Sequence, residues 1–309
     1  MRSALHPSGR LSHRQAVATM VLVTLLWSIA GVVTRQLDSA RSFELTFWRS
    51  AFNALALLPL LVWLRGAAPL AAALRRGGRA LWLSGLCWCV MYTAFMVALT
   101  MTTVANVLIT MALAPLFTAL AARVALAHAL PTRTWAAIAL AGAGIAWMYG
   151  RQVAGGETRH LLGVAVALAV PLAAAVNWTL LQYLKGPRGA GRDHAVEPDM
   201  LLAVLLGAVL SALITLPLAW PFAATSTDLG WLALLGVFQL AIPCLLAVTA
   251  ARSLNAPEIS LLALLEVVFG VAWAWIGAGE APQATVLAGG TLVLVALVAN
   301  EWPALRRAA

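Results

Sequence analysis

Long uninterrupted apolar segments recur along this chain, and they constrain its fold more than any other feature. Each is about 20 residues long, the length at which an α-helix crosses a hydrocarbon core roughly 30 Å thick. Hydrophobic residues make up 62% of the 309 residues and charged residues only 10%, which leaves too little polar surface for a water-soluble protein of this size. We therefore expect an all-α polytopic membrane protein. Ten membrane-spanning helices are predicted, at residues 16–34, 43–64, 80–99, 103–127, 133–149, 161–184, 200–220, 229–250, 256–276 and 284–300.

The basic residues indicate the orientation of these segments in the membrane. The net charge is +9, and fifteen of the twenty Lys and Arg residues fall on the side that holds the N-terminus. The opposite side has only Arg35, Arg41, Arg151 and Arg159, while Arg49 lies inside the second segment. Because cytoplasmic loops of membrane proteins are enriched in Lys and Arg, both termini are predicted to be cytoplasmic, in the cytoplasmic (inner) membrane. This distribution also accounts for the basic loops without a nucleic-acid partner.

Motifs for catalysis or cofactor binding are absent from the sequence. It contains no Gly-x-Ser-x-Gly, no His-Glu-x-x-His and no Walker motif, so neither hydrolysis nor direct coupling to ATP is expected. The three cysteines, Cys87, Cys89 and Cys244, fall within apolar segments, where they are interpreted as small apolar side chains. An enzyme is therefore not expected, and no metal site or cofactor is predicted.

Ten segments divide into two units of five, and an odd number of crossings makes the second unit enter the membrane from the opposite face. The result is an inverted repeat, an architecture common among secondary transporters, with the binding site near the midplane between the halves. An offset of 152 positions places Leu113 and Phe117 over Leu265 and Phe269. The predicted parts are an N-terminal segment at 1–14, a first unit at 15–154, a second unit at 155–302 and a tail at 303–309.

Three segments of the sequence resemble the drug/metabolite transporter superfamily. They are ANVLITMALAPLFTALAARVAL at 105–126, SLLALLEVVFGVAWAWIGAGEAP at 260–282 and LAGGTLVLVALVANE at 287–301, and an arginine early in the second apolar segment accompanies them. The resemblance is to the ten-helix type built from two EamA units, and it covers nearly the whole chain. It implies a transporter that moves amino acids, other metabolites or drugs by alternating access, generally outward.

The resemblance also assigns particular residues. Arg49 matches the arginine of the second helix, Pro115 the proline of the fourth, Glu266 the carboxylate of a Glu-Pro pair in the ninth and Glu280 the glutamate that closes the ninth. Two positions depart from the pattern. Val267 replaces the proline after Glu266, which puts a proline-made break there in doubt, and His128 stands where the first unit usually has its own closing glutamate.

Glu266 and Arg49 are the leading candidates for the transport pathway. Glu266 lies about 15 Å into its helix, near the midplane, and a charge at the bilayer centre costs on the order of 3 kcal/mol. A residue retained at such a cost is a functional hypothesis by default. The alternative for Glu266 is a structural role in tying helices together. Arg49 is expected beside an anionic substrate group or beside Glu266, with a surface pair to Glu44 as its alternative.

Other polar and aromatic side chains within the segments are weaker candidates for the same pathway. Asn106 and Thr110 follow Thr102 at intervals of four residues and so share one helix face; hydrogen bonding between helices explains such a stripe equally well. The remaining candidates are Trp27, Asn177, Gln239 and Trp273.

The function that these features favour is a secondary transporter of small metabolites that works as an exporter by alternating access. The expected partners are a small-molecule substrate and the lipid bilayer, and a proton or another ion is the candidate for coupling. A channel or a non-transporting structural membrane protein is the alternative, because the sequence does not reveal whether a gate alternates. A membrane-embedded enzyme is disfavoured for lack of a catalytic motif.

Overall fold

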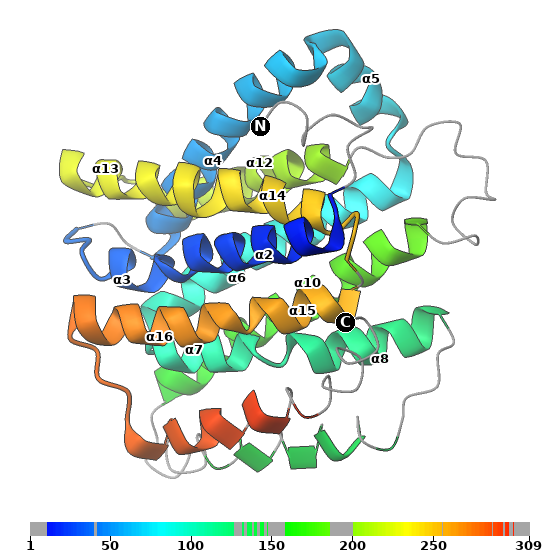
Figure 1. Ribbon diagram of the computed structural model, residues 1–309. Coiled ribbons are helices and arrows are strands. Elements are labelled where there is room, and N and C mark those ends of the chain that lie inside the picture. Colours follow the sequence, from blue (N-terminus) through cyan, green and yellow to red (C-terminus); the bar gives the residue numbers. More distant parts are fainter. Residues whose placement is uncertain are drawn as a thin grey trace.

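A computed structural model of the chain shows a bundle of helices that run roughly along one direction (Figure 1). The structure describes residues 11–39, 42–126, 132, 135–137, 139–140, 143–144, 147, 158–185, 200–254, 256–285, 287–292, 294–296 and 299. Within these residues all regular secondary structure is helical. In this part of the chain, seven helical segments are long and apolar enough to cross a membrane, so the predicted all-α polytopic membrane protein is confirmed.

Several spans consist of two or three consecutive helices. The first joins α2 (His13–Ser28) to α3 (Ala30–Thr34), and another joins α7 (Val104–Met111) to α8 (Ala114–Leu126). A third is formed by α13 (Ser226–Leu234), the π-helix η1 (Leu235–Ala241) and α14 (Ile242–Ala250). Single long helices are α4 (Ser42–Arg65), α6 (Gly78–Met101), α10 (Thr158–Lys185) and α12 (Met200–Ala219). Shorter helices include α5 (Ala67–Arg76), α15 (Ala256–Ala263) and α16 (Leu265–Ala278).

The predicted segments agree with the seven spans to within a few residues. The ninth corresponds to α15 and α16, and the tenth in part to a shorter apolar helix at Leu287–Ala296. Most of the fifth segment, His128, and the proposed boundary at 155 lie outside the described residues. The exact number of ten helices thus stays a prediction. One described helix was not predicted: α5 occupies a stretch that we interpreted as a basic loop.

The first and ninth segments lie side by side and run in the same direction. We call the end of the bundle at which α2 begins the inner end, and the opposite end the outer end. At the inner end, His13 Nε2 lies 2.6 Å from Glu258 Oε1. At the outer end, Arg35 Nε lies 3.1 Å from Glu280 Oε2. Both pairs span 245 positions, so the two segments are in register along their whole length.

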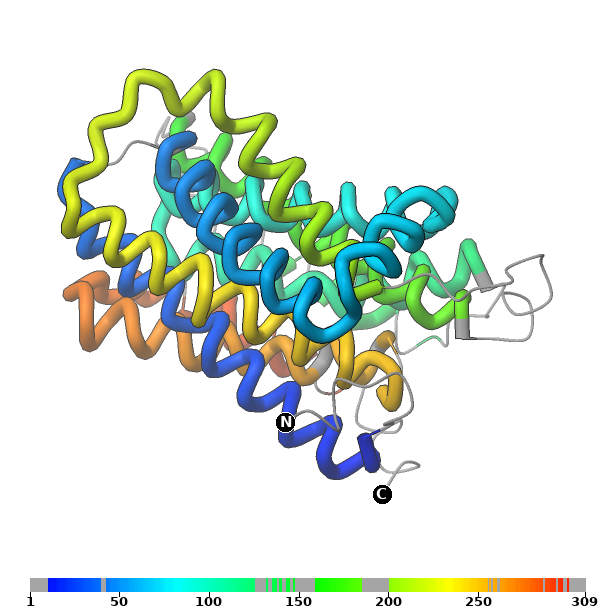
Figure 2. The backbone as a smooth tube through the Cα atoms, turned by 90° about the horizontal axis from the view of Figure 1, so that it is seen from above, coloured from blue at the N-terminus to red at the C-terminus, as the bar shows by residue number. Residues whose placement is uncertain are grey.

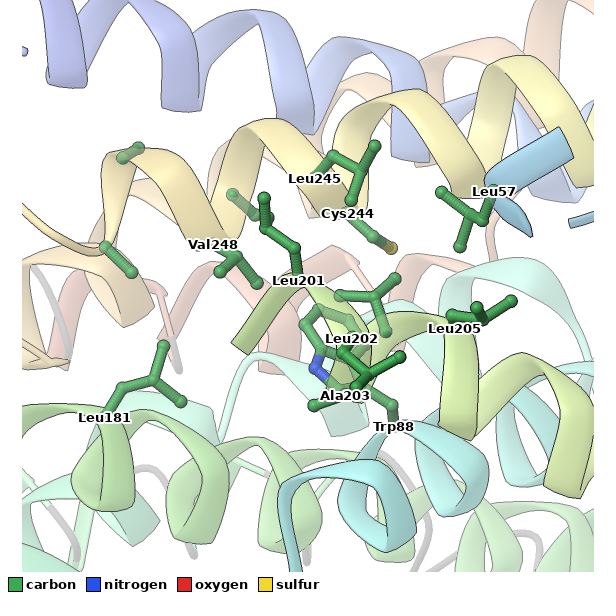
Figure 3. Packing of buried hydrophobic residues seen from close by; sticks show 14 of the residues in the cluster. Leu57, Trp88, Leu181, Leu201, Leu202, Ala203, Leu205, Cys244, Leu245 and Val248 are labelled. Atoms are coloured by element: carbon green, nitrogen blue, oxygen red, sulfur yellow. The ribbon is translucent and has the colours of Figure 1, made fainter. Parts of the chain in front are cut away.

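Two clusters of buried apolar side chains fill the bundle, one toward each end. The outer cluster includes Phe95, Leu108 and Leu264, and the inner cluster includes Leu57, Trp88 and many residues of α12 and α14. In Figure 3, Trp88 of α6 points among the leucines of α12, while Cys244 and its neighbours on α14 approach from the other side. The interior between the clusters is therefore at the middle depth of the bundle.

Helix α4 packs closely against η1, and this packing places Arg49 of α4 beside Gln239 of η1. The close approach of the two helices depends on Gly236. A Cβ atom at Gly236 would lie 2.7 Å from the Arg49 carbonyl oxygen and 2.9 Å from the Asn53 nitrogen. Both atoms belong to the backbone, so a flexible side chain cannot relieve the overlap.

We therefore expect Gly236→Ala to push α4 away from η1 and to destabilise the protein by about 1–3 kcal/mol. Gly230→Ala is the matched control, since nothing lies within 4 Å of its added Cβ and alanine is the better helix former. Thermal unfolding of both variants in one detergent measures the difference. An equal melting temperature for the two variants would contradict this packing.

Candidate functional site

A cavity of about 100 Å³ lies between the two apolar clusters, at the middle depth of the bundle. Its walls come from α2, α4, α6, α7, α8, α10, η1, α14, α15 and α16. The two ionisable side chains of strongest interest, Arg49 and Glu266, both line it. An arginine and a carboxyl group thus face the same small space in the interior of the bundle.

Arg49 is buried, with only 2% of the residue exposed, and its guanidinium group contacts three neighbouring residues. Nε and Nη2 donate hydrogen bonds of 3.1 and 2.7 Å to Gln239 Oε1, and Nη1 donates one of 3.5 Å to the Tyr92 carbonyl oxygen. The Phe95 ring lies 5.5 Å from the guanidinium carbon, within cation–π range. None of these partners carries a negative charge, so the positive charge of Arg49 is oriented but not neutralised.

Gln239 connects three helices at the cavity wall. Its Oε1 accepts both bonds from Arg49, and its Nε2 donates a 3.2 Å bond to the Trp27 carbonyl oxygen. Gln239 lies on η1, and π-helical turns within α-helices occur frequently at functional sites.

Glu266 enters the cavity from the second residue of α16 and is 6% exposed. Its carboxyl group forms no hydrogen bond with the described part of the chain, and the ion pairs found there do not include one with Arg49. A buried carboxyl group without a protein partner is costly, so the site is suited to a partner that is not part of the protein.

Helices are interrupted at the depth of the cavity. The breaks fall at Ile29, at residues 112–113, at η1 and at Leu264. At Leu264, between α15 and α16, the Val267 N–H donates to the Leu264 carbonyl oxygen three residues back, instead of four as in an α-helix. The helix is therefore interrupted here even though Val267 replaces the proline of the family pattern. Interrupted helices at mid-depth are typical of transporter binding sites.

The cavity lining is divided between the two halves of the chain in a regular way. Four pairs of lining residues are separated by the same 152 positions at which the fourth segment resembles the ninth. Within these pairs the aromatic members come from the first half, whereas the carboxylate comes from the second. The pairs are Trp88 with Leu240, Tyr92 with Cys244, Met111 with Ala263, and Ala114 with Glu266.

Of the eight predicted site residues, the structure brings four together at the cavity: Glu266, Arg49, Trp27 and Gln239. Trp273 does not line it and is 41% exposed. It shares a face with Glu266, but seven residues correspond to about 10 Å along the helix, which places it beyond the outer end of the cavity.

Asn106, Thr110 and Asn177 also lie away from this cavity and bond to neighbouring groups. Asn106 Nδ2 donates a 2.9 Å bond to Thr102 Oγ1, and the Thr110 hydroxyl donates to the Asn106 carbonyl oxygen. Asn177 Oδ1 accepts a 2.6 Å bond from the Ser84 hydroxyl, which joins α10 to α6. Their visible contacts are those of helix packing.

An aromatic wall lines the cavity, and two of its members, Tyr92 and Phe95, were missed by the sequence analysis. Trp88, Tyr92 and Phe95 lie on one face of α6, and Trp178 faces them from α10. The Trp88 and Trp178 rings meet edge to face at 5.8 Å between centroids. The spacing 88, 92, 95 is a helical i, i+4, i+7 pattern, and this was the available signal.

Comparison with known proteins supports the fold and the family. A solved crystal structure with 17% sequence identity covers 97% of this chain and 100% of its own, with a TM-score of 0.63; at that identity the likeness shows the fold alone. No protein of curated function matches the chain. Residues 14–150 match the EamA-like transporter family, a family of transporters and not of enzymes, which indicates a membrane transporter of small molecules. The similarity to the EamA-like transporter family therefore covers residues 14–150 of this chain.

Proposed function

We propose that this protein is a secondary transporter that binds a small zwitterionic metabolite, an amino acid or a related compound, in the cavity between Arg49 and Glu266. The observation that supports it is one cavity lined by a positive and a carboxyl side chain that do not pair with each other. Both positions are costly in a membrane unless something compensates them. A zwitterion would supply a carboxylate to Arg49 and an ammonium group to Glu266.

The two ends of such a substrate fit the two sides of the site. A guanidinium group binds carboxylates through several directed N–H donors, and Gln239 and Tyr92 already orient that of Arg49. The Glu266 carboxylate accepts hydrogen bonds from the ammonium group. The aromatic wall covers an apolar side chain. The volume of about 100 Å³ favours a metabolite over drug-sized ligands, whose sites are about 300–1,000 Å³.

Alternating access requires each end of the bundle to open in turn. At the outer end Glu280 Oε2 pairs with Arg35, Glu280 Oε1 accepts a 2.8 Å bond from the Val104 N–H, and Arg35 also donates to the Leu99 and Thr102 carbonyl oxygens. At the inner end His13 pairs with Glu258. We propose that rocking of the units 15–154 and 155–302, arranged as an inverted repeat of ten helices, breaks these two contacts alternately.

We propose proton coupling because Glu266 is the one carboxyl group among the described residues that line the cavity. Glu266 can hold a proton or a substrate ammonium group, but not both at once. Exchange of one for the other would drive substrate in the opposite direction to protons. Outward transport and cytoplasmic termini in the inner membrane remain part of this proposal, supported by the family resemblance and by the distribution of arginines.

The test is counterflow in proteoliposomes preloaded with amino acids, deaminated acids or organic cations, at two pH values. The proposal expects saturable exchange for a subset of the amino acids, with mutual competition and with a rate that changes with pH. Flux that does not saturate would indicate a channel instead. Exchange only of organic cations would show that Arg49 does not bind substrate.

A further inference from the structure

The short helix α5 is placed at the edge of the bundle, between the inner ends of two spans. It follows α4 and precedes α6, and it packs against α4 and α12. Gly66 and Gly78, with φ of 86° and 57°, form the turns that flank it. Such angles are readily adopted only by glycine. In Figure 1, α5 turns sharply away from α4 at the inner end, and Figure 2 shows the same reversal from above.

Two exposed tryptophans mark the membrane interface on either side of α5. Trp63, near the end of α4, is 62% exposed, and Trp82, near the start of α6, is 49% exposed. Tryptophan is enriched at the level of the lipid headgroups. Because α5 connects these two positions, it lies at or just beyond the headgroup level.

The helix is amphipathic and strongly basic at its end. Leu70 is buried in the inner cluster, whereas Arg75 and Arg76 at the end of α5 are exposed, as is Arg79 at the start of α6. These three arginines form no ion pair with the described residues. The sequence between Glu44 and Glu157 contains no acidic residue. The two acidic residues of the first unit, Asp38 and Glu44, precede α5 and lie at the outer end, away from these arginines.

We propose that α5 is an interfacial helix and that, with the start of α6, it binds the phosphate headgroups of anionic phospholipids through Arg75 and Arg76 of α5 and Arg79 of α6. Basic amphipathic helices lie in the interface with their apolar face toward the interior, and each exposed Arg near an anionic surface adds to the attraction. Through Leu70 and the contacts of α5 with α4 and α12, lipid binding stabilises the inner end of the bundle. The proposal does not depend on the transported substrate.

The experiment compares the full-length wild type with the triple variant Arg75→Gln, Arg76→Gln, Arg79→Gln. The matched control is Arg14→Gln, Arg123→Gln, Arg252→Gln, which removes the same charge from inner-end positions outside α5. Thermal unfolding in detergent is followed while phosphatidylglycerol or phosphatidylcholine is added to the micelles. Soluble glycerol phosphate serves as a further arm, to separate a lipid surface from a free phosphate.

The wild type and the control should be stabilised by phosphatidylglycerol and much less by phosphatidylcholine or glycerol phosphate. In the α5 variant the concentration of phosphatidylglycerol needed for half the effect should rise at least about 10-fold. The wild-type response should also weaken as salt is raised. An unchanged response in the α5 variant, an equal loss in the control, or equal stabilisation by both lipids would each overturn the proposal.

Discussion

Glu266→Gln is expected to reduce counterflow of the zwitterionic substrate by about 10- to 100-fold, without unfolding the protein. Glutamine has nearly the same size but cannot carry the charge that binds an ammonium group. Hydrogen bonds to charged groups contribute about 1.5–3 kcal/mol each, which corresponds to that loss. No hydrogen bond to the described residues is broken by the change, so folding should be preserved. Initial rates in proteoliposomes, normalised to inserted protein, measure the effect.

The matched control is Glu258→Gln, which removes a carboxylate eight positions earlier on the same span. Glu258 lies at the inner end beside His13 and does not line the cavity. Its variant should retain substrate affinity, although the rate of the cycle can change. Wild-type transport by Glu266→Gln across the pH range would exclude both substrate binding and proton exchange at this residue.

Arg49→Met should abolish transport of the same substrate and also destabilise the fold. The change removes the group that binds the substrate carboxylate, and it leaves Gln239 Oε1 without its two donors from Arg49. A buried acceptor left without a partner costs about 1–3 kcal/mol. The measurements are counterflow and thermal unfolding of the same preparation.

A second substitution separates folding from function. In the double variant Arg49→Met, Gln239→Leu the orphaned acceptor is gone, and replacing both partners by apolar groups can be nearly neutral. The double variant should therefore recover much of the melting temperature and none of the transport. Recovery of transport together with stability would mean that Arg49 only supports the structure.

The spans and the two charged residues could be predicted because each produces a local signal. A run of 20 apolar residues specifies a membrane helix whatever surrounds it, and a single carboxylate such as Glu266 is conspicuous within it. The helix α5 produced no such signal. Its ten residues are too few to span the membrane, and its arginines were equally consistent with a loop at the inner end.

Sequence patterns could not predict which residues contact one another across the bundle. Helical spacing correctly places Trp273 on the face of Glu266, yet it does not show that the cavity ends before Trp273. Likewise, the sequence shows that Asn106 and Thr110 share one helix face. It does not show that Asn106 bonds to Thr102, or that Thr110 bonds to the backbone of its own helix. Because these helices are apolar on every side, no polar face reveals which side meets the cavity.

Binding of three matched compounds to the wild type and to Glu266→Gln tests the central claim most directly. The compounds are an amino acid that is transported, its carboxamide, which keeps the amine, and its deaminated acid, which keeps the carboxylate. Calorimetry on purified protein in detergent gives each affinity. If Glu266 binds the ammonium group, the variant should bind the two amines about 10- to 100-fold more weakly and the deaminated acid as well as the wild type does. An equal loss for all three compounds would contradict the account.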